Sequence, residues 1–432
     1  MKMANMDDYF DVVIVGTGAA GLYCALNLPA RYRILLLTKQ KADESDSFLA
    51  QGGICMQHGE ADYRPFFDDT MRAGHYENNP ATVDLMIRSS NSIIRDLVRR
   101  GVSFARDDHG ALRFTREGAH SRPRILFHED ITGHEITQTL LNEVLRCENI
   151  ELREHTTLLD FFADASACGG VIAAGPDGEP RAIGAGAVVL ACGGIGGLYK
   201  NSTNFPHITG DAIAMALRHG VACEHLDYIQ IHPTTLYSYR KGRRFLISES
   251  VRGEGALLLD KNGNRFTNEL QPRDVVSAAI RAQMEKDGTD HVWEDMRPIG
   301  EAAIREHFPN ILERCEEEGY DPIHEPIPVV PAQHYFMGGI TADLSSRTAL
   351  PRLYACGETC CNGVHGRNRL ASNSLLESLV FAQRAADDIL YGEPPVFTGD
   401  KPDLAPYREQ EPLFAAYRQE VLTAIERSKN HE

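Results

Sequence analysis

A glycine-rich turn near the N-terminus carries the clearest chemical signal in the sequence. Gly16, Gly18 and Gly21 have the spacing that lets a backbone turn tightly, approach a pyrophosphate and pack the next helix against a strand. A β-branched run, Asp11–Val15, precedes the turn and a helical stretch, 22–28, follows it, which is the context this motif requires. The sequence therefore favours a dinucleotide site over a purely structural turn. Its predicted contacts are Gly16, Thr17, Gly18, Ala19, Ala20 and Gly21.

Three further strands indicate which dinucleotide binds. The strand 34–37 follows at βαβ distance, but Thr38 and Lys39 stand where NAD-binding proteins carry an acidic ribose partner. The run 187–194 is a buried strand ending in glycines, and the run 353–358 places Glu358 at the carboxyl end of another, where α/β sheets bind ligands. Together these segments favour FAD, held by distant parts of one interrupted domain.

Several ordered motifs give the sequence a family resemblance. The stretch Ser47–Ile54 resembles the flavin-contacting loop of the succinate dehydrogenase, fumarate reductase and L-aspartate oxidase superfamily. The similarity continues, in the family's order, from Asp11 to about Leu390. It includes the motifs 232–234, 252–255, 272–274, 334–339 and 365–377. The resemblance implies an α/β fold, with a Rossmann-like FAD-binding domain split by an α+β capping domain and followed by a short helical C-terminal tail.

The resemblance also implies how FAD is held. Relatives with covalent FAD carry a histidine at the position of Asp46, and a carboxylate cannot form that bond, so we expect non-covalent FAD. The segment 372–377 has the Ser/Asn capping residues of a helix start, and the positive end of that helix would stabilise the reduced flavin. The further implied contacts are Lys39, Ser47, Phe48, Leu49, Ala50, Gln51, Gly52, Gly53, Asp211, Glu358, Ser374 and Leu375.

The residue type at position 117 distinguishes members of the superfamily. L-Aspartate oxidases carry glutamate in the motif 115–122, whereas relatives specific for plain dicarboxylates do not. Aspartate differs from succinate by one ammonium group, which a carboxylate in the site can bind while disfavouring succinate. The alternative interpretation of Glu117 is a solvated loop charge. We predict instead that it selects the substrate's nitrogen.

Arginines and histidines complete the site that the resemblance implies. Arginine suits a dicarboxylate because its planar guanidinium binds carboxylates bidentately and stays charged. Arg273 lies at the family's catalytic arginine, where we expect participation in orientation or proton relay rather than action as a base. The expected substrate-binding residues are Glu117, His232, Ser248, Glu249, His334, Arg369 and Ser372. Cys356, Cys360, Cys361 and His365 are loosely spaced like metal ligands, but they overlap the flavin motif, so we expect no metal.

Composition limits the classes of partner. The formal charge of −17 argues against nucleic acid, because phosphate binding needs a basic surface. No apolar run approaches the roughly 20 residues that span a bilayer, so no membrane association is expected. Residues 1–10 lack the pattern of an export signal and the ten cysteines lack a disulfide framework's spacing, so the cytoplasm is the expected compartment.

The 432 residues are predicted to form two domains and a tail. We assign 7–222 and 337–391 to the FAD-binding domain, and 223–336 to the capping domain, with a helix over 275–286 and a proline-rich exit at 325–331. Residues 392–432 are predicted to be a linker and a truncated helical tail, in which Leu413, Phe414, Tyr417, Val421, Leu422 and Ile425 recur at helical spacing.

The leading hypothesis is FAD-dependent oxidation of L-aspartate to iminoaspartate, the first step of NAD biosynthesis, with fumarate or dioxygen as electron acceptor. Quinolinate synthase, which would use the product, is a candidate partner. The alternatives are a soluble fumarate reductase with non-covalent FAD, and a non-catalytic flavin-binding or assembly protein. Glu117 and the absence of a haem-binding CxxCH motif speak against the first, and the retained Arg273, Arg369 and histidines speak against the second.

Overall fold

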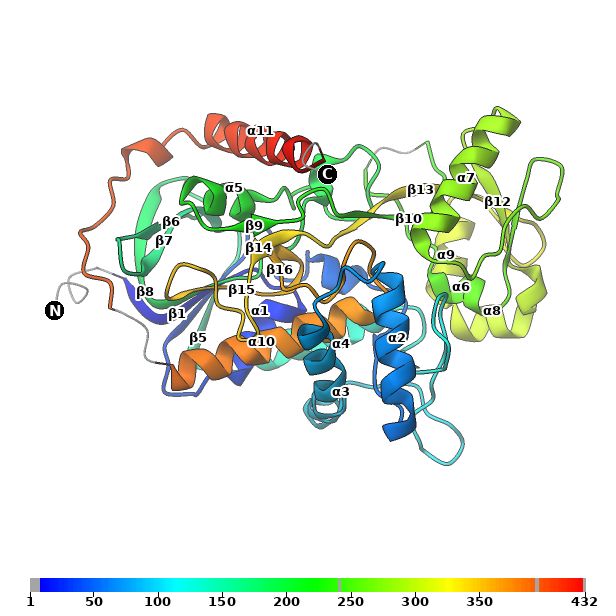
Figure 1. Cartoon of the computed structure of the whole chain (residues 1–432), viewed down its shortest axis with the longest axis horizontal. Helices are drawn as coiled ribbons and strands as arrows, with labels where there is room; N and C mark the ends of the chain where they lie inside the picture. Colours follow the sequence, from blue (N-terminus) through cyan, green and yellow to red (C-terminus); the bar gives the residue numbers. More distant parts are fainter. Residues whose placement is uncertain (1–7, 240–241, 393–395, 430–432) are drawn as a thin grey trace.

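The computed structural model describes residues 8–239, 242–392 and 396–429, and within these ranges the chain builds two main sheets (Figure 1). The larger sheet has seven strands in the order β5-β2-β1-β8-β7-β6, with β15 also paired to β8. Its strands are β1 (Tyr9–Val15), β2 (Ile34–Leu37), β5 (Ile150–Arg153), β6 (Thr157–Ala163), β7 (Cys168–Ala174), β8 (Pro180–Leu190) and β15 (Leu353–Ala355). The predicted α/β class is confirmed.

Strand β1 shows how the larger sheet is buried on both faces. Val12 and Ile14 point into the core formed with α1 (Ala19–Asn27) and α10 (Asn373–Tyr391), whereas Val13 and Val15 point into the opposite core. β1 pairs in parallel with both β2 and β8, which explains its continuous β-branched sequence. The other helices of this region are α2 (Tyr63–Ala73), α3 (Pro80–Arg100), α4 (Thr132–Val144), α5 (Asp211–Arg218) and α11 (Gln410–Lys429).

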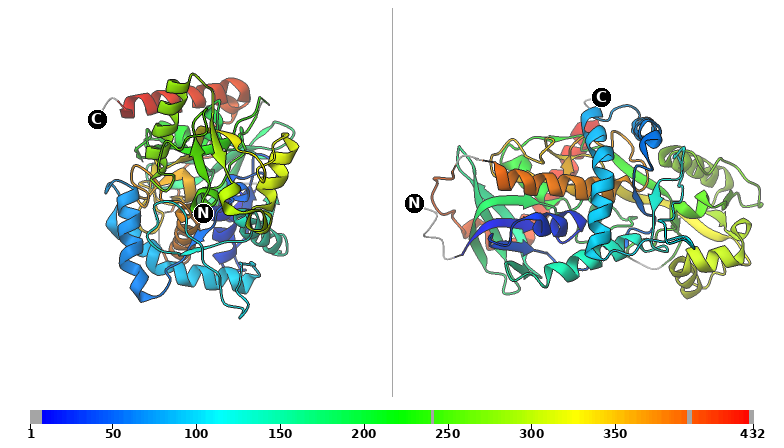
Figure 2. Two further views of the ribbon diagram at one scale, coloured as in Figure 1. Left: turned by 90° about the vertical axis from the view of Figure 1, so that its right-hand side faces the viewer. Right: turned by 90° about the horizontal axis from the view of Figure 1, so that it is seen from below.

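The second sheet is antiparallel and lies at the opposite end of the molecule (Figures 1 and 2). Its order is β10-β13-β12-β11, with β10 (Ile229–Leu236), β11 (Leu257–Leu259), β12 (Val292–Asp295) and β13 (Ile327–Phe336). Helices α6 (Glu249–Gly253), α7 (Arg273–Asp287), α8 (Glu301–His307) and α9 (Pro309–Glu317) accompany it, and an apolar cluster including Val276, Ile304 and Ile311 forms its core. We refer to this region as the cap.

Two small sheets accompany the two main sheets. β9 (Cys223–Glu224), β14 (Gly339–Thr341) and β16 (Cys360–Cys361) form one, while β3 (Ile54–Cys55) and β4 (Ile125–Leu126) form the other. The first stands where the chain enters and leaves the cap, since β9 directly precedes β10 and β14 directly follows β13. No helix in the described ranges is long and apolar enough to cross a membrane. The precise domain boundaries stay predictions.

The predicted proline-rich exit at 325–331 is a strand instead. β13 begins at Ile327 and includes Pro328 and Pro331. Pro328 offers its carbonyl to the Tyr237 backbone N–H, and Pro331 lies opposite a register shift between His232 and Thr235. A proline is tolerated at such an irregularity because no ladder N–H is needed there.

Candidate active site

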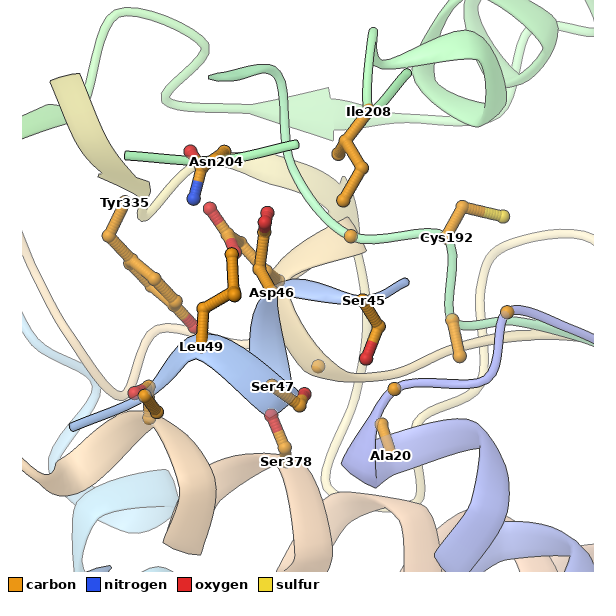
Figure 3. Close-up of a pocket in the computed structure, with 18 of the residues that line it drawn as sticks. Ala20, Ser45, Asp46, Ser47, Leu49, Cys192, Asn204, Ile208, Tyr335 and Ser378 are labelled. Carbon is orange, nitrogen blue, oxygen red and sulfur yellow. The ribbon is translucent and has the colours of Figure 1, made fainter. Parts of the chain in front are cut away.

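A large cavity of about 1680 Å³, part of it open to solvent, follows the carboxyl ends of β1, β2 and β15 and extends to the cap. Its walls come from sequence segments that are far apart. Figure 3 shows the short 3-10 turn Asp46–Leu49, with the start of α1 at Ala20 to one side and Asn204 and Tyr335 across from it. Binding at the carboxyl ends of parallel strands is the expected position for a dinucleotide.

Two glycines of the glycine-rich turn have no room for a side chain. Gly16 has φ +113°, and a Cβ there would lie 2.0 Å from the Ala191 carbonyl oxygen. A Cβ on Gly21 would lie 1.9 Å from the Gly16 carbonyl oxygen, so Gly21 lets α1 pack directly on the turn. The Ala19 backbone N–H, in the first turn of α1, donates to Ser47 Oγ at 3.0 Å. The turn and the 3-10 segment therefore form one rigid edge of the cavity.

Lys39 is fixed at the end of β2 by an ion pair. Its Nζ lies 2.7 Å from Asp211 Oδ2 and also donates to the His207 carbonyl oxygen at 3.1 Å. Asp211 is the first residue of α5, where the helix dipole favours a negative charge. The ion pair brings together two predicted cofactor contacts that are far apart in the sequence.

Two partly buried carboxyl groups, Asp46 and Glu358, line the cavity. Burial raises the pKa of Asp46 to about 7, although the Phe205 backbone N–H donates to its Oδ1 at 2.9 Å. Burial and the nearby Asp46 raise the pKa of Glu358 to about 8. The raised pKa values favour a proton on this pair of carboxyl groups, and a protonated carboxyl group can donate a hydrogen bond to a ligand.

Unsatisfied polar atoms provide a test of whether FAD fits this cavity. Ser45 Oγ, Asp46 Oδ2 and Gln51 Oε1 are buried and have no hydrogen-bond partner among the described residues. All three residues line the cavity. Buried polar groups need partners, and the hydroxyl, phosphate and ring-nitrogen groups of FAD can supply both donors and acceptors. The residues present therefore fit the cofactor.

At the cap end, Glu117 is buried and hydrogen-bonded on both oxygens. Ser250 donates to its Oε1 at 2.9 Å and Ser372 donates to its Oε2 at 2.5 Å. A Cβ on Gly52 would lie 2.3 Å from Glu117 Oε1, so the glycine makes space for this carboxylate. Burial and the nearby Glu249 raise the pKa of Glu117. The geometry excludes a solvated loop charge, since only 3% of Glu117 is exposed.

Arg273 is held by a buried chain of polar contacts. Its Nε donates to Glu249 Oε2 at 2.6 Å, and its Nη1 donates to Gln230 Oε1 at 2.9 Å. Gln230 donates in turn to the Arg369 carbonyl oxygen at 2.8 Å. Burial alone would raise the pKa of Glu249, but Arg273 and Arg252 outweigh it and lower that pKa. Glu249 therefore stays ionised beside the Arg273 guanidinium.

Arg369 lies with its guanidinium 4.0 Å from the centroid of the Tyr335 ring. Its Nε has no hydrogen-bond partner among the described residues, and only 5% of the residue is exposed. Burial and the nearby Arg273 lower the pKa of Arg369 to about 10. A buried cation with an unused N–H is a strong site for an incoming carboxylate.

The two predicted histidines meet edge to face, with ring centroids 5.1 Å apart. His334 Nδ1 lies 2.7 Å from Thr203 Oγ1, while His232 Nε2 is buried without a hydrogen-bond partner in the described part of the chain. Burial holds the pKa of both rings well below the usual range, aided by Arg273 at His232 and Arg369 at His334. Both rings are therefore neutral and can offer one N–H donor each.

The predicted cap of α10 is not formed by Ser372. This residue precedes the helix with φ +62°, and its hydroxyl donates to Glu117 instead of accepting from the helix N–H groups. The first turn of α10 still lines the cavity through Ser374 and Leu375. Ser248, by contrast, caps α6 by accepting from the Ser250 backbone N–H at 3.2 Å. Capping residues in a sequence therefore do not specify which partner a hydroxyl takes.

Most predicted site residues line this one cavity. The exceptions are Ala19 and Gly21, which lie in the turn behind it, and Phe48, which packs in the core with its ring 5.7 Å from that of His134. The predicted residues that line the cavity are Gly16, Thr17, Gly18, Ala20, Lys39, Ser47, Leu49, Ala50, Gln51, Gly52, Gly53, Glu117, Asp211, His232, Ser248, Glu249, Arg273, His334, Glu358, Arg369, Ser372, Ser374 and Leu375.

Sequence reasoning missed several contributors. Tyr335 stacks on Arg369 and lies inside a motif that was recognised, so its neighbours were a usable signal. Gln230, which joins Arg273 to the Arg369 backbone, carries no motif of its own. Other lining segments gave no signal in the sequence. They are 156–158, 203–204, 207–210, Arg243 and Ser378.

Known proteins resemble this chain along most of its length. A family profile described as FAD binding domain matches residues 11–375. The L-aspartate oxidase of Clostridium perfringens is 48% identical over 380 residues, which cover 88% of this chain and 86% of that protein. The chain belongs to the L-aspartate oxidase family. The L-aspartate oxidase of a Nostoc species is 44% identical over 442 residues, covering 98% of this chain and 76% of the relative.

A solved structure supports the same grouping. The structure of a variant of the E. coli quinol fumarate reductase superposes with a TM-score of 0.83 and 31% identity, covering 95% of this chain and 74% of that one. The predicted membership of the superfamily and the predicted cofactor, FAD, are both confirmed.

Proposed function

We propose that the protein oxidises L-aspartate to iminoaspartate with non-covalently bound FAD, the first step of NAD biosynthesis. The observation that carries the proposal is the charge pattern at the cap end of the cavity. Two buried arginines, Arg273 and Arg369, lie in one cavity with the buried carboxylate of Glu117. L-Aspartate carries two carboxylates and one nitrogen, which is the complementary pattern.

In this proposal each end of the substrate has its own partner. Arg369 binds one carboxylate through its unused N–H, and the neutral His232 and His334 add hydrogen-bond donors nearby. Arg273 binds near the other carboxylate, with its orientation fixed by Glu249 and Gln230. Glu117 accepts a hydrogen bond from the substrate nitrogen. Succinate leaves that buried carboxylate without a new partner, so it binds less well.

Bound FAD would accept the hydride from the substrate Cα. The substrate ammonium group would release one proton to solvent before this step and a second as the C=N bond forms, which leaves the neutral imine. Arg273 positions the substrate rather than acting as the base, and its own orientation is set by the contact of its Nε with Glu249 Oε2. The first turn of α10 lines the cavity at Ser374 and Leu375, so its backbone N–H groups and positive helix end would stabilise negative charge on the reduced cofactor. Asp46 in place of a histidine keeps the cofactor dissociable.

Fumarate or dioxygen takes up the electrons, and quinolinate synthase is the proposed consumer of iminoaspartate. A soluble fumarate reductase is the second candidate, since the structural relative is a fumarate reductase and the arginine pattern suits any four-carbon dicarboxylate. Glu117 favours the first candidate. A cytoplasmic location remains a prediction from the sequence.

An anaerobic titration tests the proposal. The purified yellow protein is mixed with L-aspartate, D-aspartate or succinate while the absorbance of the flavin is recorded. We expect L-aspartate alone to bleach the flavin. Bleaching by succinate to the same extent would favour the fumarate reductase, and no bleaching by any of the three would support a non-catalytic flavin protein.

A further inference from the structure

Helix α11 lies along the outer face of the FAD-binding region, beside α5 (Figure 1). In Figure 1 it lies apart from the cap helices α6, α7, α8 and α9. Its buried side chains, Tyr417, Val421 and Ile425, belong to the same core as α5 and one face of the large sheet. The predicted helical spacing of the tail is confirmed, with Leu422 on the outer side and 39% exposed.

Helix α11 contacts three segments that line the cofactor cavity. Phe414 lies under Lys39, with Nζ 5.0 Å from the ring centroid. Val421 packs on Gly210, where a Cβ would lie 3.5 Å from Val421 Cγ1. Tyr417 donates its hydroxyl hydrogen to the Leu159 carbonyl oxygen at 2.7 Å, directly after Leu158 in the cavity wall.

These three segments form the end of the cavity that is remote from the substrate. In a βαβ dinucleotide fold, the residues that follow the second strand face the adenosine ribose, and Thr38 and Lys39 hold that place after β2. Asp211, the partner of Lys39, begins α5, and α5 is the helix against which α11 packs. An ion pair from Arg218 to Glu420, at 2.7 Å, fixes the other end of α5 to α11.

We propose that α11 is a clamp on the adenosine end of the cofactor site. It sets the affinity for FAD by holding Lys39, Asp211 and residues 158–159 of β6 in their binding positions. The proposal rests on FAD occupying this cavity, but not on aspartate being the substrate. Phe414, Tyr417 and Val421 are thus positioning residues that act through the cavity wall. Because linkage is reciprocal, bound FAD also stabilises the docking of α11.

The contrasting view is that α11 only covers apolar surface. In that case a substitution on α11 lowers the stability of the fold without changing the affinity of the folded protein for FAD. The two views therefore differ in the dissociation constant measured under native conditions, whatever happens to the melting temperature.

The experiment uses the full chain stripped of FAD and titrated with FAD, with quenching of flavin fluorescence as the readout. We expect Phe414→Leu, which keeps an apolar side chain but removes the ring, to raise the FAD dissociation constant about 2- to 5-fold, the loss of one cation–π contact. The matched control on the same helix is Leu422→Ala, which should leave the constant unchanged. Equal constants for Phe414→Leu and the wild type would overturn the proposal.

A double-substitution cycle locates the route of the effect. If Phe414 acts through the ammonium group, Phe414→Leu changes FAD affinity in the wild type but not in a Lys39→Met background. Independent, additive effects of the two substitutions would overturn this route. Failure of the wild-type protein to bind FAD would instead refute the cofactor assignment itself.

Hydrogen exchange gives a second readout that does not depend on a variant. We expect the amides of α11 to exchange more slowly once FAD is added to the stripped protein, while those of the cap helix α8, far from the adenosine end, serve as the internal comparison. Unchanged exchange in α11 together with tight FAD binding would show that the helix does not sense the cofactor, and the clamp would be rejected.

Discussion

Each end of the cofactor cavity holds an ion pair, and the two pairs differ in their access to water. Lys39 and Asp211 are 2.7 Å apart with side chains 29% and 14% exposed, whereas Arg273 and Glu249 are 2.6 Å apart with side chains 8% and 2% exposed. Water and salt screen the first pair far more than the second. Breaking the Lys39–Asp211 pair is therefore expected to cost little folding free energy, whereas breaking the Arg273–Glu249 pair is expected to cost much more.

The largest effect is expected from breaking the buried pair. Glu249→Gln leaves Arg273 as an unpaired buried cation, and removing one partner of such a pair costs about 3–5 kcal/mol of folding free energy. Urea unfolding monitored by circular dichroism measures this loss. A change below about 1 kcal/mol would mean that water reaches the cap end as freely as the adenosine end.

A second buried carboxyl group in the cap, Glu294, should make the stability of the fold depend on pH. Glu294 is fully buried with no hydrogen-bond partner among the described residues, and burial raises its pKa to about 8. Because the folded state holds this proton longer than the unfolded state, Glu294 lowers stability as pH rises from its ordinary pKa toward 8.

The wild type should lose a few kcal/mol of unfolding free energy as the pH rises from about 5 to about 8, and Glu294→Gln should not. The variant should therefore gain that amount relative to the wild type over this range. Thermal melts at both pH values measure the difference, with Glu313→Gln at an exposed position of α9 as the control. A difference that does not depend on pH would show that Glu294 is hydrated.

The next effect concerns selectivity. Glu117→Gln should raise the KM for L-aspartate about 30- to 150-fold, because a charge-assisted hydrogen bond in a buried site contributes roughly 2–3 kcal/mol, while fumarate reduction changes much less. In the wild type, affinity for L-aspartate should fall as pH drops through the raised pKa of Glu117, and the variant should lose this dependence. Equal losses of both activities would contradict nitrogen recognition.

The smallest effect should come from the partly exposed pair. Lys39→Met is expected to lower folding stability by about 1 kcal/mol or less, and the difference should shrink as salt is added. Urea unfolding at low and high ionic strength measures both quantities. A loss as large as that of Glu249→Gln would mean that exposure does not distinguish the two ends.

Local features of the fold were predictable from the sequence, whereas the pairings in the site were not. The strand 34–37 and the glycine turn follow from short-range patterns, because backbone sterics and burial act on neighbouring residues. The contact between Glu117 and Ser372 joins positions 255 residues apart, and no periodicity encodes it. Family resemblance placed both residues at the substrate. That the Ser372 hydroxyl donates to Glu117 and does not cap α10 follows only from the three-dimensional structure.

The two hydroxyl groups on Glu117 come from different parts of the molecule. Ser372 precedes α10 in the FAD-binding region, and Ser250 belongs to α6 in the cap. A movement of α6 away from the large sheet would separate Ser250 from this carboxylate and leave Ser372 as its remaining hydroxyl donor. The position of the cap therefore tunes how firmly the carboxylate that selects the substrate nitrogen is held.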